Sequence, residues 1–475
     1  MVCSSDLNVF LNPKSVAVIG ASERPGSWGR FIMEGLLSTN YPGIIYPVNR
    51  QTRRIFHLPG FSDIRHIEEP VDLAVISIPE QYLEETIKAC GEKKVKGITI
   101  ITAGFAETSE EGRRFQERLT RSARSLNIRL LGPNVSGTFN LHAGFNASST
   151  HSKNLLRTPI TAVCQGGYAI HDLIASARHR KMGIGKFVHT GNEADLTVTD
   201  FLEFFENDPE TQAIVIYIES IRDGKRFMDV AGRVNQKQPV IVYKGGRTVD
   251  SSRAAQSHTG ALSSEWKMIK GMINQTGIVL SPAMELLLPL AHSLIERPRM
   301  KGRRIGIITM GGSWGVSLAD CLVESGLTVP EFSDDLQKKL RELGLLPRAS
   351  SKNPVDFGAA GKFGETDFLL SLGREVIQSG EVDAMVLHGF GQAGMESQGT
   401  ETPRLSREVE KNQILQFSGL EREMDLPVFI GNHHGIWESK TISELNEKGI
   451  RIYTRLHDIA WILSAMVKYW SKRPA

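Results

Sequence analysis

Short, continuous apolar runs that alternate with amphipathic helical stretches are the feature that most constrains this sequence. The first runs are Ser15–Ile19, Ile44–Val48, Leu73–Ile78, Ile98–Ile101 and Ile128–Leu131. Strands that are apolar at every position, rather than at alternate positions, are buried on both faces, as in a parallel sheet covered by helices. Helical stretches such as Glu84–Cys90 and Glu110–Leu126 separate the runs. The pattern predicts an α/β protein that begins with a Rossmann-type unit.

The same pattern restarts twice along the chain. A second series of apolar runs begins at Ile160–Cys164, and a third begins at Arg304–Thr309. At roughly 150 residues per domain, 475 residues also suggest about three domains. We expect domains over 1–145, 150–297 and 302–475. The expected linkers lie near 141–158, which is rich in Ser, Asn and His, and at Glu296–Gly302.

Composition excludes several other classes of protein. Hydrophobic residues make up 40% and charged residues 23%, as in ordinary globular proteins. The net charge of +3 and the lack of a basic block do not indicate a nucleic-acid partner. The four cysteines are far apart, so we predict no metal site and no disulfide, and we expect a reducing compartment. With no recognisable leader and no apolar run near the ~20 residues of a membrane span, a cytoplasmic location without a membrane partner is expected.

A glycine-rich turn joins the first predicted strand to a helix. It contains Gly20, Ala21, Ser22, Arg24, Pro25, Gly26 and Ser27. Backbone amides in such a turn, together with a helix N-terminus, bind phosphate. The spacing is not GxGxxG, and Asn49-Arg50 follows the second strand where an NAD-binding protein has a carboxylate. Arg24 and Arg50 suit the additional ribose phosphate of coenzyme A (CoA), although an ordinary tight turn is the alternative interpretation.

Three further segments follow strands of the same predicted sheet. Ligands of parallel sheets bind beyond the carboxyl ends of the strands, so these segments should face one site. We therefore assign to the same CoA site the residues Ile78, Pro79, Thr102, Ala103, Gly104 and Asn134.

The most specific signal is His258, which lies in the segment Ala254–Leu262. A neutral imidazole is a good nucleophile toward phosphorus, and small hydroxylated neighbours allow a phosphate to approach. Gln165, Gly166 and Gly167 follow a strand and begin a helix, whose free amides can bind phosphate. Glu219 follows another strand and can fix the imidazole tautomer. The alternatives are a histidine bonded within an ordinary loop and a glutamate in a simple ion pair.

Taken together, these motifs resemble the nucleoside-diphosphate-forming acyl-CoA synthetases. The nearest resemblance is to the α subunit of ADP-forming acetate–CoA ligase, a relative of succinyl-CoA synthetase. The resemblance rests on Glu219 and on Ser15–Ser22, Pro25–Ser27, Tyr46–Asn49, Thr102–Phe105, Gly132–Asn134, Gly191–Asn192 with Asp195, Ser257–Gly260, Gly311–Gly315 and Asn353–Asp356. These segments follow the order of the family and extend over essentially the whole chain.

The resemblance implies a CoA-binding Rossmann-type domain followed by two flavodoxin-like α/β domains. It implies that acyl-CoA, phosphate and ADP are interconverted with a carboxylic acid, CoA and ATP. The reaction would pass through an acyl phosphate and through a phosphohistidine at His258, with Glu219 holding the imidazole. ADP or ATP with Mg²⁺ would bind to a separate ATP-grasp β subunit, in an α2β2 assembly.

One motif departs from the family pattern. The phosphate-binding turn of relatives typically reads Ser-Gln-Ser-Gly, whereas this chain has Cys164-Gln165-Gly166-Gly167. Two hydroxyl groups are lost, while the backbone amides remain. The departure favours an alternative function, a non-catalytic regulatory homologue that binds CoA or acyl-CoA, whereas the presence of His258 and Glu219 favours the ligase.

Overall fold

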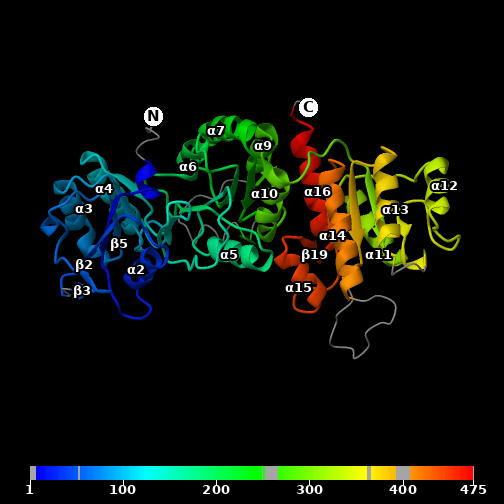
Figure 1. The fold of residues 1–475 in the computed structure, drawn as a ribbon. Helices are drawn as coiled ribbons and strands as arrows, with labels where there is room; N and C mark the ends of the chain where they lie inside the picture. The colour runs from blue at the N-terminus through cyan, green and yellow to red at the C-terminus, as the bar shows by residue number, and fades with distance from the viewer. Residues whose placement is uncertain are drawn as a thin grey trace. The chain divides into compact units, whose positions relative to one another are not determined.

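The computed structural model describes residues 7–51, 54–248, 250–251, 266–360, 365–391 and 407–473. Helices and strands alternate along the chain, as the apolar runs predict (Figure 1). The chain forms two compact units, Met1–Ala291 and His292–Ala475. Within the described residues, no helix is long and apolar enough to span a membrane.

The first sheet of the N-terminal unit has five parallel strands in the order β2-β1-β5-β6-β7. The strands are β1 (Ser15–Ile19), β2 (Ile44–Val48), β5 (Leu73–Ile76), β6 (Gly97–Ile100) and β7 (Arg129–Leu131). The helices of this part are α2 (Trp28–Ser38), α3 (Leu83–Glu92) and α4 (Glu110–Ser125). Every residue of β1, β5 and β6 is buried, which confirms the expectation of a parallel sheet covered on both faces. Pro47 lies in the edge strand β2, where its missing N–H group costs no ladder bond.

The second sheet of this unit has seven strands in the order β14-β13-β12-β10-β11-β8-β9. The strands are β8 (Gly137–Asn140), β9 (Phe145–Ser148), β10 (Ile160–Cys164), β11 (Lys186–His189), β12 (Ala213–Ile218), β13 (Val240–Lys244) and β14 (Val279–Leu280). The accompanying helices are α5 (Ala169–His179), α6 (Val198–Phe205), α7 (Gly224–Lys237), α9 (Trp266–Thr276) and α10 (Leu287–Glu296). β10 to β14 are parallel, and β8 and β9 form an antiparallel hairpin at one edge.

The segment near 141–158, which the sequence suggests as a linker, contains a buried strand. Strand β9 lies within this segment and is fully buried. Its polar side chains bond one another: the Asn146 amide donates to the Thr150 carbonyl and to the Ser152 hydroxyl, both at 3.0 Å. The Ser148 hydroxyl donates to the Asn146 side-chain oxygen at 2.6 Å. Polar residues can therefore be buried here, because each finds a partner, and composition alone could not distinguish this from an exposed linker.

Helix α2 of the first sheet packs against β9 of the second sheet. A Cβ atom added at Gly35 of α2 would lie 2.7 Å from the Asn146 carbonyl oxygen and 3.0 Å from the Ser148 carbonyl oxygen. This close contact explains why the first two sheets belong to one compact unit. The predicted domain boundaries stay a prediction, but the second sheet begins before residue 145.

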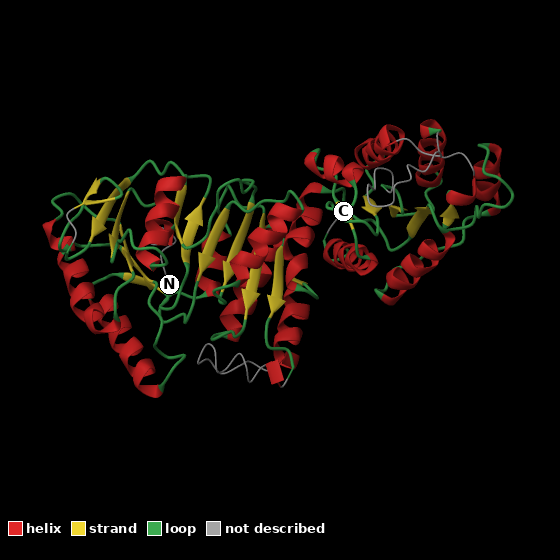
Figure 2. Cartoon of the chain, turned by 90° about the horizontal axis from the view of Figure 1, so that it is seen from below, coloured by secondary structure: helices red, strands yellow, loops and turns green. Residues whose placement is uncertain are grey.

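The C-terminal unit contains one parallel sheet in the order β16-β15-β17-β18-β19. Its strands are β15 (Ile305–Thr309), β16 (Val355–Asp356), β17 (Ala384–His388), β18 (Val428–Gly431) and β19 (Ile452–Tyr453). Its helices are α11 (Gly312–Glu324), α12 (Asp334–Glu342), α13 (Thr366–Gln378), α14 (Arg407–Glu423), α15 (Lys440–Glu447) and α16 (Leu456–Trp470). Figure 2 shows helices flanking the strands in both units.

The parallel strands of all three sheets share one spatial order. Numbered along the chain within each sheet, they run 2-1-3-4-5, the order of doubly wound flavodoxin-like folds. In this order the chain reverses direction across the sheet between strands 1 and 3, and ligands bind beyond the carboxyl ends of these two strands. The expected positions are therefore β1 with β5, β10 with β12, and β15 with β17. The α/β fold with its repeated units is confirmed.

We predict that Gly35→Ala destabilises the N-terminal unit by about 1–3 kcal/mol, because the carbonyl groups of β9 leave no room for a methyl group. Thermal or urea unfolding checks this. The matched control is Gly232→Ala in α7, where no atom lies within 4 Å of the new Cβ, so the replacement should stabilise by about 0.5–1 kcal/mol. Equal stabilisation by both replacements would contradict the packing of α2 on β9.

Candidate active site

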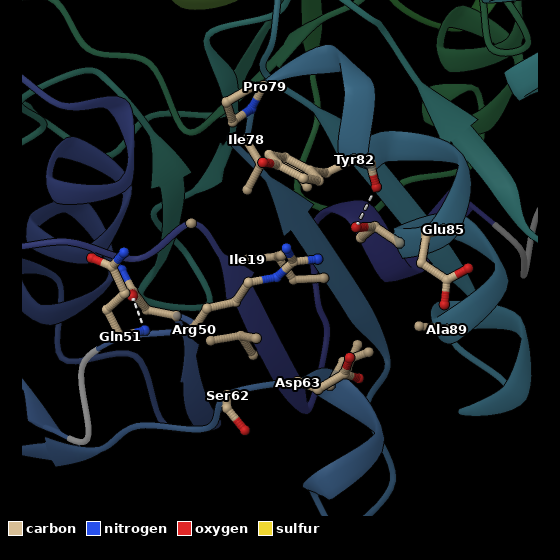
Figure 3. Close-up of a pocket in the computed structure, with 15 residues that line it drawn as sticks. Ile19, Arg50, Gln51, Ser62, Asp63, Ile78, Pro79, Tyr82, Glu85 and Ala89 are labelled. Carbon is tan, nitrogen blue, oxygen red and sulfur yellow. Dashed lines mark hydrogen bonds between the residues drawn. The ribbon is translucent and has the colours of Figure 1, made fainter.

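A cavity of about 420 Å³ opens at the carboxyl ends of the first sheet (Figure 3). It lies at the β1–β5 position that the strand order predicts. Five residues of the predicted CoA site line it: Gly20, Asn49, Arg50, Ile78 and Pro79. The sequence prediction missed other lining residues, among them Gln51, Ser62, Asp63, Tyr82, Glu85 and Thr86. They lie on short helices and loops after β2 and β5, where no strand-end pattern marks them.

Arg50 is a positively charged residue that lines this cavity. Its guanidinium carbon lies 4.7 Å from the centre of the Tyr82 ring, and Figure 3 shows the side chain reaching across the cavity toward that ring. Stacking on an aromatic ring orients a guanidinium group without neutralising it. The Arg50 charge is therefore available to a phosphate in the cavity.

The turn after β1 is shaped by glycine. Gly20 has φ +94°, and a Cβ atom there would lie 2.4 Å from the Ser77 carbonyl oxygen. Gly29 in the first turn of α2 approaches the Gly20 carbonyl oxygen so closely that a Cβ atom there would lie 1.9 Å away. Ser27 is the N-cap residue of α2, and its hydroxyl donates to the Arg24 carbonyl at 2.8 Å. The start of α2 therefore packs against Gly20, which lines the cavity, whereas the other predicted residues of the turn, Ala21, Ser22, Arg24, Pro25, Gly26 and Ser27, are not among the cavity-lining residues.

The loops after β5, β6 and β7 are hydrogen-bonded in series. The Thr102 hydroxyl donates to the Ile78 carbonyl at 2.7 Å, and the Asn134 amide N–H donates to the Thr102 carbonyl at 3.0 Å. Gly104 has φ +110°, and its N–H donates to the Glu107 carboxylate at 2.7 Å. The structure thus brings Thr102, Ala103, Gly104 and Asn134 to the same edge of the sheet as the cavity.

The predicted phosphate turn lies at the corresponding edge of the second sheet. Gln165 follows β10, and its side-chain oxygen accepts from the backbone N–H groups of Glu219 at 2.6 Å and of Ser220 at 3.0 Å. A Cβ atom at Gly166 would lie 2.7 Å from the Tyr217 ring and 3.3 Å from the Glu219 carboxylate. The turn and Glu219 are therefore direct neighbours, and glycine at 166 leaves room for Tyr217.

Glu219 has one carboxylate oxygen available for a further partner. The residue is 7% exposed, and its Oε1 accepts from the Tyr217 hydroxyl at 3.1 Å. Its Oε2 is buried and has no hydrogen-bond partner among the described residues. A buried carboxylate oxygen without a partner is costly, so an additional donor is expected at this position. His258, the predicted donor, lies outside the described residues.

The sequence prediction missed two residues beside Glu219. Tyr217 lies on the same face of the chain as Glu219, two residues earlier, and strand periodicity could have revealed it. Lys244 ends the apolar strand β13 and is fully buried. Its ammonium group donates to the carbonyls of Gly245 and Gly246. Burial lowers the pKa of Lys244, while the charge of Glu219 opposes that shift.

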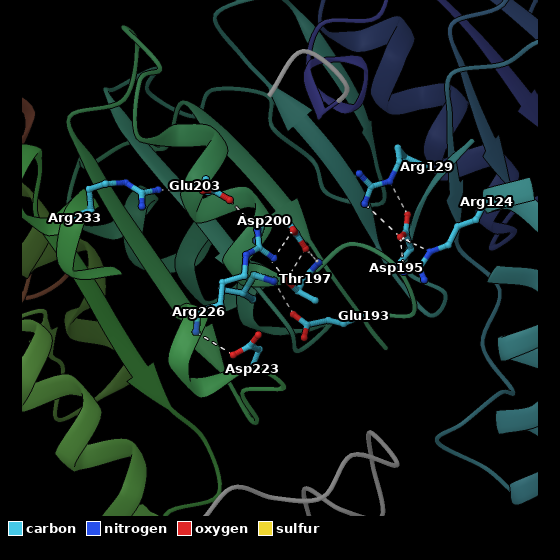
Figure 4. A network of polar contacts seen from close by, with 11 residues as sticks. Arg124, Arg129, Glu193, Asp195, Thr197, Asp200, Glu203, Asp223, Arg226 and Arg233 are labelled. Carbon is cyan, nitrogen blue, oxygen red and sulfur yellow. Dashed lines mark hydrogen bonds and ion pairs between the residues drawn. The ribbon is translucent and has the colours of Figure 1, made fainter. Parts of the chain in front are cut away.

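The loop between β11 and α6 performs two separate roles (Figure 4). Glu193 lines a small cavity of about 60 Å³ together with Gln165, and burial raises the pKa of its carboxyl group. Asp195 instead receives Arg124 at 2.8 Å and Arg129 at 2.9 Å, as Figure 4 shows. Asp195 therefore links the second sheet to arginines of the first sheet, while Glu193 lies beside Gln165 of the predicted phosphate turn.

Comparison with known proteins agrees with this architecture. Residues 14–139 match the model of a CoA binding domain, and residues 157–294 match the succinyl-CoA ligase like flavodoxin domain. The chain is 34% identical to the α subunit of acetate–CoA ligase [ADP-forming] I of Pyrococcus furiosus over 98% of both proteins. It is 31% identical to 4-hydroxybutyrate–CoA ligase [ADP-forming] of Nitrosopumilus maritimus, over 76% of this chain and 51% of that protein.

A solved structure shows the same fold. The Ca. Korarchaeum cryptofilum dinucleotide forming acetyl-coenzyme A synthetase 1, in complex with phosphate and ADP, superimposes with a TM-score of 0.85 at 29% identity, over 98% of this chain and 97% of that chain. The chain belongs to the α-subunit family of the ADP-forming acetate–CoA ligases, which are nucleoside-diphosphate-forming acyl-CoA synthetases. The suspected family is thereby confirmed.

We predict that Asp195→Asn destabilises the protein by about 2 kcal/mol at pH 7, because two charge-assisted contacts are weakened. The arginines and the Leu130 N–H outweigh burial and lower the pKa of Asp195. The stabilisation is therefore present above the ordinary aspartate pKa of about 4 and is lost as the pH falls through the lower pKa of the folded state. Urea unfolding at pH 7 and at pH 3 should show the difference between wild type and variant shrinking on acidification.

The matched control for this measurement is Asp229→Asn, which changes an exposed aspartate on α7. It should change stability by less than about 0.5 kcal/mol at either pH. If Asp195→Asn changed the free energy of unfolding by no more than this control, Asp195 would not stabilise the contact between the two sheets.

Proposed function

We propose that this chain is the α subunit of an ADP-forming acyl-CoA synthetase. It would interconvert acyl-CoA, phosphate and ADP with a carboxylic acid, CoA and ATP. The observation that carries the proposal is the buried Oε2 of Glu219, which has no hydrogen-bond partner among the described residues and lies beside the Gln165–Gly167 turn. A phosphate-binding turn next to a carboxylate that can hold an imidazole is the arrangement that phosphoryl transfer to a histidine requires.

The first sheet would bind CoA. The amides of the Gly20–Ser27 turn and the start of α2 suit the diphosphate, since a helix N-terminus favours anions. Arg50 in the cavity and Arg24 in the turn would neutralise the phosphate on the ribose. The loops that contain Thr102 and Asn134 continue along the same edge and would guide the thioester toward the second sheet.

The second sheet would carry the chemistry. Phosphate held by the amides of Gly166 and Gly167 attacks the thioester carbonyl, the C–S bond breaks, and CoA leaves with formation of an acyl phosphate. An imidazole nitrogen of His258 then attacks phosphorus, the bond from phosphorus to the acyl oxygen breaks, and the carboxylate leaves. Glu219 accepts a hydrogen bond from the other imidazole nitrogen and stabilises the phosphohistidine. Preorganised amide donors supply most of the charge stabilisation.

The final transfer needs a partner. ADP and Mg²⁺ would bind to a separate ATP-grasp β subunit in an α2β2 assembly, to which His258 delivers the phosphoryl group. The printed name of the Pyrococcus relative, subunit alpha, supports a second kind of subunit. The names of the relatives, acetate and 4-hydroxybutyrate ligases, suggest a short-chain acid as the product.

The alternative is a non-catalytic homologue that binds CoA or acyl-CoA and regulates another protein. Cys164 and Gly166, which stand where the family turn typically has hydroxyl-bearing serines, favour it. The buried Glu219 Oε2, which lacks a partner within the described part of the chain, favours the ligase, because a regulatory protein has no need to keep it.

We predict that the wild-type chain gains one acid-labile phosphoryl group on incubation with acetyl-CoA or 4-hydroxybutyryl-CoA, phosphate and Mg²⁺. His258→Ala should gain none, and Glu219→Gln should be phosphorylated roughly 10- to 100-fold more slowly. Intact-protein mass spectrometry over time measures all three proteins. If the wild type is not phosphorylated even with its ATP-grasp partner, while it still binds CoA, the regulatory alternative is correct.

We predict that Arg50→Ala weakens CoA binding by about 10- to 100-fold, because a charge-assisted contact to the ribose phosphate is lost. Binding of dephospho-CoA, which lacks that phosphate, should change by less than threefold. Isothermal titration calorimetry with both ligands gives the comparison. Arg121→Ala on α4 is the matched control and should bind both ligands as the wild type does. An equal loss for both ligands would place Arg50 away from the ribose phosphate.

A further inference from the structure

A buried histidine joins the two halves of the proposed site. His189 is the last residue of β11 and is 3% exposed. Its Nδ1 lies 2.7 Å from the Ser136 backbone nitrogen and 3.0 Å from the Ser136 hydroxyl. Its Nε2 lies 2.9 Å from the Gln165 carbonyl oxygen. The imidazole thus spans from the loop after β7 to the turn after β10.

The chemistry of these partners selects one form of the ring. The Ser136 backbone N–H can only donate, so Nδ1 must be an unprotonated acceptor. The Gln165 carbonyl can only accept, so Nε2 must carry the proton. Only the neutral imidazole protonated at Nε2 satisfies both contacts.

Each contact reaches a residue next to the proposed ligands. Ser136 lies two residues after Asn134, whose own N–H bonds to Thr102 in the proposed CoA site. Gln165 begins the proposed phosphate turn. A Cβ atom at Gly167 would lie 3.3 Å from Cε1 of His189, so the ring also lies directly behind the last glycine of that turn.

A second, independent bridge joins the same two edges. The Glu107 carboxylate accepts from the Gly104 N–H and, at 2.5 Å, from the Asn192 side-chain amide. Asn192 lies in the loop that directly follows His189 and Thr190. This bridge holds the CoA edge without contacting Gln165. The Gln165 side chain is bonded separately to the Glu219 and Ser220 backbone N–H groups, and His189 adds a contact to the Gln165 carbonyl.

We propose that His189 is a positioning residue whose neutral imidazole sets the conformation of the Gln165–Gly167 turn and thereby the affinity for phosphate. This inference rests on the proposed function of that turn. The turn has lost two hydroxyl groups, with cysteine at 164 and glycine at 166, so we expect its backbone amides to bind phosphate, and a backbone with two adjacent glycines needs external support to stay in one conformation. The His189–Gln165 bond adds to that support on the backbone side of the turn, while the Gln165 side chain is bonded to the Glu219 and Ser220 backbone N–H groups.

Two replacements separate the two contacts. His189→Asn places a carboxamide oxygen near the position of Nδ1, which keeps the Ser136 contact and loses the Gln165 contact. His189→Gln reaches the position of Nε2 and can still donate to the Gln165 carbonyl. We expect His189→Asn to raise the KM for phosphate about tenfold with less than a twofold change in the KM for acetyl-CoA. His189→Gln should stay within about threefold of wild type for phosphate.

The measurements use the full chain with its ATP-grasp partner and acetyl-CoA as the substrate. The matched control is His142→Asn, which changes a partly buried histidine whose ring nitrogen lies 3.2 Å from the Thr158 carbonyl oxygen. It should leave both KM values unchanged. ¹⁵N NMR of histidine-labelled protein should show a ring protonated at Nε2 in the wild type, with its signals absent from the His189→Asn spectrum.

The outcomes distinguish the inference from the proposed function. If the wild type turns over but His189→Asn raises both KM values equally, or only lowers the thermal unfolding midpoint, His189 is structural and the inference is wrong. A ring protonated at Nδ1 would also overturn it. If the wild type itself shows no phosphate-dependent turnover while it binds CoA, the proposed function fails, and the inference fails with it.

Discussion

The parallel pairing of β10 with both of its neighbours is the constraint on which the proposed chemistry depends. In that register Cys164 lies level with His189 on β11 and with Tyr217 on β12. β10 and β11 end at this level and β12 ends one residue later, so the residues after them, Gln165, Thr190 and Glu219, emerge at one edge. Parallel strands are joined by long crossovers, so residues far apart in the sequence are brought within hydrogen-bond distance. A slip of one residue in any of these strands would separate the turn from its carboxylate.

The first and second sheets are joined by specific polar contacts as well as by packing. Helix α2 packs on β9, Asp195 receives two arginines from the first sheet, and Glu107 binds Asn192. The Asp195 carboxylate is buried and Arg129 is mostly buried, so their ion pair contributes more than an exposed one would, whereas Arg124 is largely exposed and contributes less. In the proposed reaction, a thioester bound at the edge of the first sheet must be held close to a phosphate bound at the edge of the second sheet. These contacts restrict the movement of the loops that would hold the two groups.

The C-terminal unit repeats the strand order without repeating the residues. At its β15–β17 position the rings of Trp314, His388 and His433 contact one another, with centres 4.6 to 5.8 Å apart. Burial, assisted by the neighbouring His433, lowers the pKa of His388 to about 4, so this histidine is neutral at ordinary pH. The second sheet instead presents a glycine turn and a carboxylate at the same topological position. The same strand order is thus found with different side chains at the strand ends in each unit, because the loops and not the strands supply the functional groups.

The sequence by itself determined most of the strands, the order of the units and five of the residues that line the cavity of the first sheet. Fully apolar runs that alternate with helical stretches favour a covered parallel sheet, and strand ends then predict which loops line a cavity there, as Gly20 and Asn49 show. It could not reveal that the polar segment around Asn146 is buried, because burial of polar groups depends on partners that only folding supplies. Nor could it reveal Tyr82, Lys244 or His189, whose surroundings depend on how separate strands and loops pack. The local sequence pattern determines whether a segment forms a helix or a strand, while the long-range pairing of strands determines which side chains come into contact.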